Sequence, residues 1–189
     1  GSGTTITRTW SWTYGTLGRV LTATDPNGKV TTTTWHSDSD PDLGKRGQVA
    51  TLTNPLGHVT QYTAYDAGNR LTSMTDPNGL VTSFGYNFRG LLLSRNAGGQ
   101  QTTFTYHPTG ELLRTTMPDG SWVERQYDTA MRFTGTTDSG GHRVVYTLDS
   151  EGNRLAEQHH GPWGATYLRR FTYDEQNRLT HEHDSLNRL

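Results

Sequence analysis

Aromatic or apolar residues recur along the chain at a nearly constant interval, with short polar, Thr-rich stretches between them. We call these recurring positions the anchors: Tyr14, Trp35, Tyr65, Tyr86, Tyr106, Tyr127, Leu148 and Tyr173. The interval between them is 20 or 21 residues, apart from one of 30 and one of 25. A fixed period of this length is typical of repeat architectures. The sequence therefore predicts tandem copies of one small unit.

Each copy carries two turn signals. Four residues after most anchors stands a residue that tolerates positive φ at low cost, namely Gly18, Asn69, Gly90, Gly110, Gly152 or Asn177, with Met131 as the exception. The second signal is a tetrapeptide typical of type I turns, such as Asp25, Pro26 and Gly28 or Asp76, Pro77 and Gly79. Residues 54–57 have the same form, and looser forms occupy residues 96–99, 138–141 and 161–164. We expect reversals near residues 15–18, 25–28, 66–69, 76–79, 87–90, 107–110, 118–120 and 138–141, with positive φ at Asn69, Gly90, Gly110 and Asn177.

The stretches between turns have the length of strands. Six or seven residues separate the turns, and no 3.6-residue apolar period is present. Phe84 and Tyr86 are two positions apart, so a strand would present both on one face. The sequence predicts an all-β fold of tandem antiparallel hairpins, about fourteen strands from seven to eight copies, forming a twisted, coiled ribbon. We expect a single array over residues 4–189, with loop insertions near 37–47 and 159–170, after an expression-linker remnant at residues 1–3.

Composition and charge narrow the function classes. Only 30% of the 189 residues are hydrophobic, so a large central core is not expected. The 17 basic and 18 acidic residues give a net charge of -1, which argues against nucleic acid as a partner. The absence of cysteine excludes disulfide and thiolate chemistry, and no motif indicates a cofactor. No apolar run is long enough for a membrane span, and no signal peptide opens the chain.

One acidic stretch offers a possible metal site. Asp38, Asp40 and Asp42 alternate, and such carboxylates can chelate calcium. An EF-hand loop would require Gly at its sixth position and Glu at its twelfth, where this chain has Leu43 and Val49. We favour a solvated loop, with calcium as the minor alternative.

Other candidate motifs have structural explanations. Residues 137–141 resemble the nucleophile loop of trypsin-like proteases but stand where the second turn is expected. His181 and His183 lack a third metal ligand at a suitable spacing. The acids after the anchors, such as Asp66, favour turn capping, and we expect arginines such as Arg70 to pair with them across neighbouring hairpins. The sequence therefore predicts no enzyme.

Trp163 is a separate candidate for ligand contact. It stands on a predicted turn inside the second irregular copy. An exposed Trp can contact a partner, but it can equally cover a bend in the ribbon, and both interpretations stay open at this point.

The repeat resembles a known family. The pattern Tyr-Asp-x-x-Gly/Asn-Arg-Leu, then Asp-Pro-x-Gly, then a Thr-rich strand ending in the next Tyr, is similar to the YD repeat of Rhs proteins, Tc toxin C components and teneurins. Residues 65–79 and 173–179 fit this pattern almost without gaps, and the resemblance extends over residues 4–189. It implies a ribbon that, in complete members, spirals into a hollow shell around a toxin segment.

The resemblance also implies a function and partners. The chain would be a non-catalytic shell segment of a secreted or cell-surface, bacterial toxin protein, and its partners would be the remaining shell and the enclosed toxin segment. The alternative is an adhesion module that binds a glycan or a surface protein, as in teneurin-like members. The self-cleaving region and toxin tip that follow the last repeat of Rhs members have no counterpart here, so the chain resembles an internal fragment whose residues 187–189 open another unit. Open strand edges and a row of anchor tyrosines would favour self-association.

Overall fold

The fold is all-β, as predicted. In this computed structural model, residues 8–185 are described, apart from the side chains of residues 165, 166 and 185. The described residues form sixteen strands and no helix, and the strands of the sheet follow the order of the chain without a crossover. The expected number was about fourteen. The structure has sixteen because all eight anchors close a strand and each is followed by a second one.

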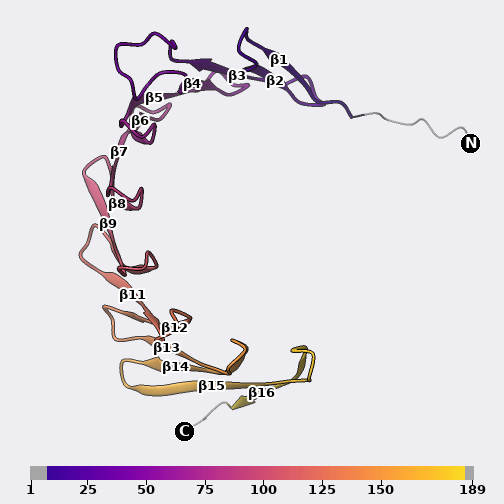
Figure 1. Ribbon diagram of the computed structural model, residues 1–189, viewed down its shortest axis with the longest axis vertical. Helices are drawn as coiled ribbons and strands as arrows, with labels where there is room; N and C mark the ends of the chain where they lie inside the picture. The colour runs from indigo at the N-terminus through magenta and orange to yellow at the C-terminus, as the bar shows by residue number, and fades with distance from the viewer. Residues whose placement is uncertain (1–7, 186–189) are drawn as a thin grey trace, which may run out of the picture. The chain divides into compact units, whose positions relative to one another are not determined.

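The chain divides into two compact units, residues 1–100 and 101–189. The first contains β1 (Ser11–Tyr14), β2 (Val20–Thr24), β3 (Val30–Trp35), β4 (Val49–Thr53), β5 (Val59–Tyr65), β6 (Leu71–Thr75), β7 (Val81–Tyr86) and β8 (Leu92–Ala97). Within this unit each strand is antiparallel to the one before it (Figure 1).

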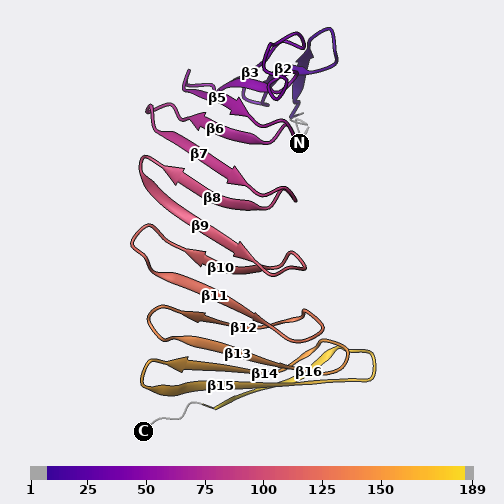
Figure 2. The ribbon, with the colours of Figure 1, turned by 60° about the vertical axis from the view of Figure 1, so that its left-hand side comes forward.

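The second unit has the same construction. It contains β9 (Gln100–Tyr106), β10 (Leu112–Thr116), β11 (Trp122–Tyr127), β12 (Phe133–Asp138), β13 (Arg143–Leu148), β14 (Arg154–Gly161), β15 (Gly164–Tyr173) and β16 (Leu179–Ser185). Its strands also pair antiparallel in chain order. Figure 2 shows that successive turns of this unit lie at alternate ends of the strands.

Most hairpins close with one kind of turn. At residues 76–79, Gly79 N donates to Asp76 O at 3.0 Å and Asp76 N donates to Leu80 O at 3.0 Å. This is a type I turn followed by a left-handed residue, a common three-residue hairpin loop. The carboxylate of Asp76 also accepts from Asn78 N and Leu80 N. The backbone pattern recurs at residues 15–18, 25–28, 54–57, 66–69, 87–90, 107–110, 117–120, 128–131, 138–141, 149–152 and 174–177, which confirms the predicted reversals.

The predicted left-handed residues are confirmed. The φ angles are 60° at Asn69, 83° at Gly90, 116° at Gly110 and 59° at Asn177. Met131 broke the sequence rule, yet its φ is also 60°. Its Cβ makes this conformation unfavourable, so the turn geometry outweighs the preference of the residue.

A β-bulge accompanies every anchor, which the sequence analysis did not predict. Gly85 pairs with Ser94 and Tyr86 with Leu92, so Leu93 is an extra residue opposite the anchor. The extra residues of the other repeats are Leu21, Ala50, Thr72, Leu113, Thr134, Leu155 and Thr180. Bulges bend their strand and increase its local twist. One such feature per repeat gives each unit a regularly repeated bend.

The sheet has no enclosed hydrophobic core. No hydrophobic side chain of the described residues is fully buried, and the buried positions are Gly44, Thr82 and Gly135. Each repeat therefore depends on its immediate neighbours for packing, as expected of a one-dimensional array.

The two irregular repeats accommodate their extra residues differently. Residues 36–48 form a loop that lies on the turn at residues 66–69, where Asn69 Nδ2 donates to Gly44 O at 3.1 Å. In the other repeat the extra residues lengthen β14 and β15 to eight and ten residues and place Trp163 at the hairpin tip. Residues 1–3 and 187–189, for which we proposed a linker and the opening of another unit, lie outside the described residues.

Candidate functional site

The junction between successive repeats is held by an Asp–Arg pair in the turn after the anchor. Asp66 Oδ1 accepts from Gly68 N at 2.8 Å and Arg70 N at 3.0 Å, and Asp66 Oδ2 accepts from Arg70 Nε at 2.7 Å. The backbone N–H of Arg70, helped by its guanidinium, holds the pKa of Asp66 below its ordinary value. One carboxylate thus closes the turn and fixes the arginine.

The fixed arginine reaches the following repeat. Arg70 Nη1 donates to Asn87 O at 3.0 Å, and its guanidinium carbon lies 5.0 Å from the centre of the Tyr86 ring. This arrangement combines a hydrogen bond with a cation–π contact. The pair Asp128 and Arg132 repeats the hydrogen bond, since Arg132 Nη1 donates to Asp149 O at 2.7 Å, but the next anchor there is Leu148, which has no ring.

This geometry corrects one expectation. We expected such arginines to pair with acids of neighbouring hairpins, but Arg70, Arg132 and Arg178 each pair with the acid four residues earlier in their own turn. The contact from Arg70 and Arg132 to the neighbouring repeat goes to a backbone carbonyl instead. A four-residue separation inside a tight turn brings the two side chains together at lower entropic cost.

Whereas Arg70 and Arg132 contact the following repeat, several anchor side chains donate a hydrogen bond to the preceding repeat. Tyr86 OH donates to Leu71 O at 3.0 Å, and Tyr127 OH donates to Leu112 O at 2.9 Å. Equivalent bonds run from Tyr65 to Val49, from Tyr173 to Arg154 and from the indole N–H of Trp35 to Val20. Burial raises the pKa values of Tyr65 and Tyr86. The amphipathic ring packs on the sheet while its polar end finds a carbonyl.

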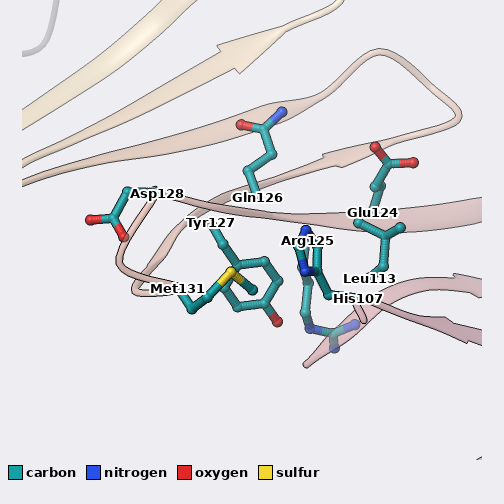
Figure 3. A pocket seen from close by; sticks show the side chains of 8 residues that line it. All are labelled: His107, Leu113, Glu124, Arg125, Gln126, Tyr127, Asp128 and Met131. Atoms are coloured by element: carbon teal, nitrogen blue, oxygen red, sulfur yellow. The ribbon is translucent and has the colours of Figure 1, made fainter. Parts of the chain in front are cut away.

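A hollow of about 260 Å³ lies beside the anchor Tyr127 (Figure 3). In β11 the side chains of Glu124 and Gln126 point to one side of the strand and those of Arg125 and Tyr127 to the other, as strand alternation requires. Leu113, the extra residue of the bulge at Tyr106, lines the hollow together with the neighbouring turns.

Three residues that line the hollow beside Tyr127 differ from the residue types usual at their repeat positions. His107 stands where the turns after Tyr65, Tyr86, Tyr127, Leu148 and Tyr173 begin with Asp or Asn, and Met131 stands where the others of these turns have Gly or Asn. Arg125 stands two residues before the anchor, the place that Phe84 and Phe104 occupy in the two preceding repeats. Arg125 Nη1 is buried and has no hydrogen-bond partner among the described residues.

An equivalent hollow of about 260 Å³ lies beside the anchor Trp35. Gly15, Leu21 and Trp35 line it, at the repeat positions of His107, Leu113 and Tyr127. Here Arg19 lies with its guanidinium carbon 5.6 Å from the Trp35 ring centre. Its Nη2 donates to Asp38 Oδ1 at 2.5 Å and its Nη1 to Asp38 Oδ2 at 3.1 Å, and this pairing holds the pKa of Asp38 below its ordinary value.

In the loop of residues 36–48, the carboxylates of Asp38, Asp40 and Asp42 accept hydrogen bonds from the chain itself. Besides the Asp38 pair with Arg19, Asp40 Oδ1 accepts from Asp42 N at 2.9 Å, and Asp42 Oδ1 accepts from Gly44 N at 3.0 Å. Across residues 8–185, no group of three His, Asp or Glu side chains is placed to hold a metal ion.

The remaining sequence candidates lie apart from these hollows. Residues 138–141 form a hairpin turn, and Ser139 Oγ accepts from Trp122 N at 3.2 Å. The rings of His181 and His183 stack on β16 with centres 6.1 Å apart. Trp163 is 97% exposed at its hairpin tip. In the part of the chain that the structure describes, no helix has the length and apolar character to cross a membrane.

The sequence of the chain is similar to known proteins. The RHS Repeat family model matches residues 45–81, 65–92 and 86–121. The double-stranded DNA deaminase toxin A of Burkholderia cenocepacia (strain H111) is 32% identical over 58% of this chain, and the match spans 10% of that protein. The chain therefore corresponds to a small part of this relative's length.

Solved structures show the same fold. In the crystal structure of TcdB2-TccC3-Cdc42, the match covers 86% of this chain and 12% of that one, with a TM-score of 0.57 and 15% identity. In TcdB2-TccC3 it covers 91% and 12%, with a TM-score of 0.56 and 16% identity. The chain is therefore similar to the RHS Repeat family over residues 45–121, and it shares its fold with these toxin structures.

Proposed function

We propose that the chain is a non-catalytic segment of the wall of an Rhs-type shell, which encloses a toxin or effector segment of a secreted bacterial protein. The observation that carries the proposal is the absence of a fully buried hydrophobic side chain in residues 8–185, combined with side-chain bonds that join each repeat to the next. Such a sheet grows by repetition and leaves both faces available for other material.

The relatives support this proposal. One is named a toxin, and the similar structures are complexes that contain TccC3. The proposed partners are the remainder of the repeat shell and the segment it encloses. We further propose that residues 4–189 form a single array, since the repeat pattern continues throughout them.

A photo-cross-linking experiment tests the enclosure. Ser83 and Phe84 are adjacent in β7 and point to opposite faces. A photoreactive amino acid is placed at either position in the protein expressed from its natural gene, and the cross-linked peptides are identified by mass spectrometry. We expect one position to capture a segment of the same protein outside the repeats, and the other to capture none.

Two outcomes would overturn the proposal: no captured segment from either face, or equal capture from both. The non-catalytic part has its own test. The purified chain should release no ammonia from double-stranded DNA, whereas the toxin from Burkholderia cenocepacia serves as the positive control.

A second function is favoured by the exposed rings at the hairpin tips. Trp163 is 97% and Phe88 96% exposed, and an exposed Trp can stack on a sugar or on a partner protein. Glycan titration monitored by Trp fluorescence, with Trp163→Ala as the control, tests this adhesion function. A fluorescence change that persists in the variant would remove Trp163 from the contact.

Self-association of the isolated chain is a further part of the proposal. Its terminal strands β1 and β16 each have one unpaired edge within the described residues, and such edges favour pairing with another chain. Light scattering at increasing concentration should show a rising average mass. A constant monomer mass would show that the chain protects its own edges.

A further inference from the structure

Arg125, which is partly buried in the hollow beside Tyr127, has one buried guanidinium nitrogen, and this nitrogen points to a missing partner of opposite charge. An arginine remains charged at every physiological pH, and burying a charged donor without a hydrogen bond is unfavourable. Arg125 Nη1 is in that situation among the described residues. Unpaired buried polar groups are rare, and a ligand is one of the established reasons for them.

The nearby carboxylates of the chain are already engaged. Asp128 Oδ2 accepts from Arg132 Nε at 2.7 Å, and Glu124 Oε2 accepts from Arg114 Nε at 2.8 Å. Glu124 also points to the opposite side of β11 from Arg125 (Figure 3). Neither acid can serve Arg125 without giving up its present partner.

We propose that the hollow beside Tyr127 binds a carboxylate group, with Arg125 as the cation that holds it. The planar guanidinium can donate two parallel hydrogen bonds to a carboxylate, which gives both strength and orientation. Leu113, Tyr127 and Met131 line the same hollow and would contact the carbon atoms that carry the carboxylate.

Size and lining limit the ligand. The hollow measures about 260 Å³, which is smaller than the pockets that hold drug-sized molecules. It therefore suits one acidic side chain of a peptide or one small free carboxylate. Glu124 and Asp128 also line the hollow, each paired with another arginine, so the position left for a carboxylate is at Arg125. Leu113, Tyr127 and Met131 favour the side chain of a Glu, whose methylene groups precede its carboxylate.

The equivalent hollow beside Trp35 provides a precedent for an Arg–carboxylate pair in this place, although its Arg19 stands five residues after an anchor and Arg125 two residues before one. There the chain itself places the Asp38 carboxylate on Arg19. Residues 128–131 form an ordinary four-residue turn, so the corresponding part of the Tyr127 hollow has no loop that could supply such a group. The site belongs to one repeat and would exist whether or not the chain forms part of a toxin shell.

NMR titration of the whole chain tests the site. The probes are acetate, the peptide Ac-Ala-Glu-Ala-NH2 and its neutral match Ac-Ala-Gln-Ala-NH2, and the signals followed are the Arg125 side-chain Nε–H and the Met131 methyl group. We expect saturable shifts with the Glu peptide, none with the Gln peptide, and binding at least about tenfold weaker for Arg125→Gln. Arg143→Gln, a change at an exposed arginine of β13, should leave binding unchanged.

The arms of this experiment separate the sources of the carboxylate. A Glu peptide that binds more tightly than acetate indicates an acidic peptide segment, whereas equal binding indicates a small free carboxylate. Equal shifts with the Gln peptide, or unchanged binding by Arg125→Gln, would overturn the proposal. Should that variant lose its folded spectrum, Arg125→Phe restores the ring found at Phe84 and Phe104 and must also abolish the shifts.

Discussion

The hollows beside Trp35 and Tyr127 occupy the same repeat position but differ in what the chain places in them. Beside Trp35, the inserted residues 36–48 fold back and bring Asp38 to Arg19. Beside Tyr127, no insertion follows the anchor, and Arg125 Nη1 keeps no partner in the described part of the chain. Both repeats share the bulge and the anchor hydrogen bond, so the backbone stays constant while individual side chains change what the repeat can bind.

The difference between the two hollows depends on how the inserted loop of residues 36–48 packs on the turn at residues 66–69. Gly44→Ala should disrupt this packing. A Cβ at Gly44 would lie 2.8 Å from Tyr65 O and closer still to Asp66 O. Because backbone atoms cannot move aside, we expect a loss of about 2–3 kcal/mol in the free energy of unfolding, measured by urea denaturation. Gly15→Ala is the control, since its Cβ would meet Leu21 at an ordinary 3.6 Å. Equal urea midpoints for Gly44→Ala and the unmodified chain would show that the loop is not seated as described.

The turn of the Tyr127 hollow offers a stabilising change. Met131 has a φ of 60°, which Asn adopts more readily. We expect Met131→Asn to raise the free energy of unfolding by about 0.5–1 kcal/mol in urea denaturation. Met74→Asn makes the same change within strand β6 and should destabilise. A loss of stability in Met131→Asn would mean that the contacts of Met131 in the hollow outweigh its backbone strain.

Acid should open the Trp35 hollow. Pairing with Arg19 lowers the pKa of Asp38 in the folded state. A lowered folded pKa means that the pair stabilises the loop above the ordinary aspartate pKa of about 3.9 and that this stabilisation is lost as the pH falls through the folded value. The NMR signal of the Trp35 indole N–H should shift in this range. In Asp38→Asn that shift should disappear, and a persisting transition would assign it to another group.

The regular features of the fold could be predicted from sequence because each depends on a local preference. Asn69 and Gly90 are residue types that favour the left-handed conformation, and Asp76 is one that caps a turn. Both preferences act within four residues, so the sequence alone indicates them. Met131 has no such preference, and its conformation follows from its neighbours in the sheet. The bulges escaped prediction because they depend on pairing between strands, although the doubled apolar positions at residues 92–93 and 112–113 are a signal that could have indicated them.

The hollows were not predictable in the same way. Arg125 and His107 are 18 positions apart in the sequence and come together only because of the register of β9, β10 and β11. Nor could the repeat pattern show which acid pairs with each arginine, since Arg70 pairs with Asp66 of its own turn and Arg19 pairs with Asp38 of the inserted loop. An aligned comparison of repeats would have revealed Arg125 as a departure from the aromatic pattern, but not that one of its nitrogen atoms lacks a partner.

The smallest expected effect is also the most direct test of the equivalence between the two hollows. Asp38→Ala removes the carboxylate that the chain supplies to Arg19, so Arg19 loses its ion-pair partner in the Trp35 hollow. If the chain's own carboxylate and an external one are interchangeable there, Ac-Ala-Glu-Ala-NH2 should now shift the Arg19 side-chain Nε–H, which it leaves unaffected in the unmodified chain. NMR titration with the Gln peptide as the control measures this gain, and the absence of any Arg19 shift would show that the inserted loop shapes the Trp35 hollow in ways beyond the one carboxylate.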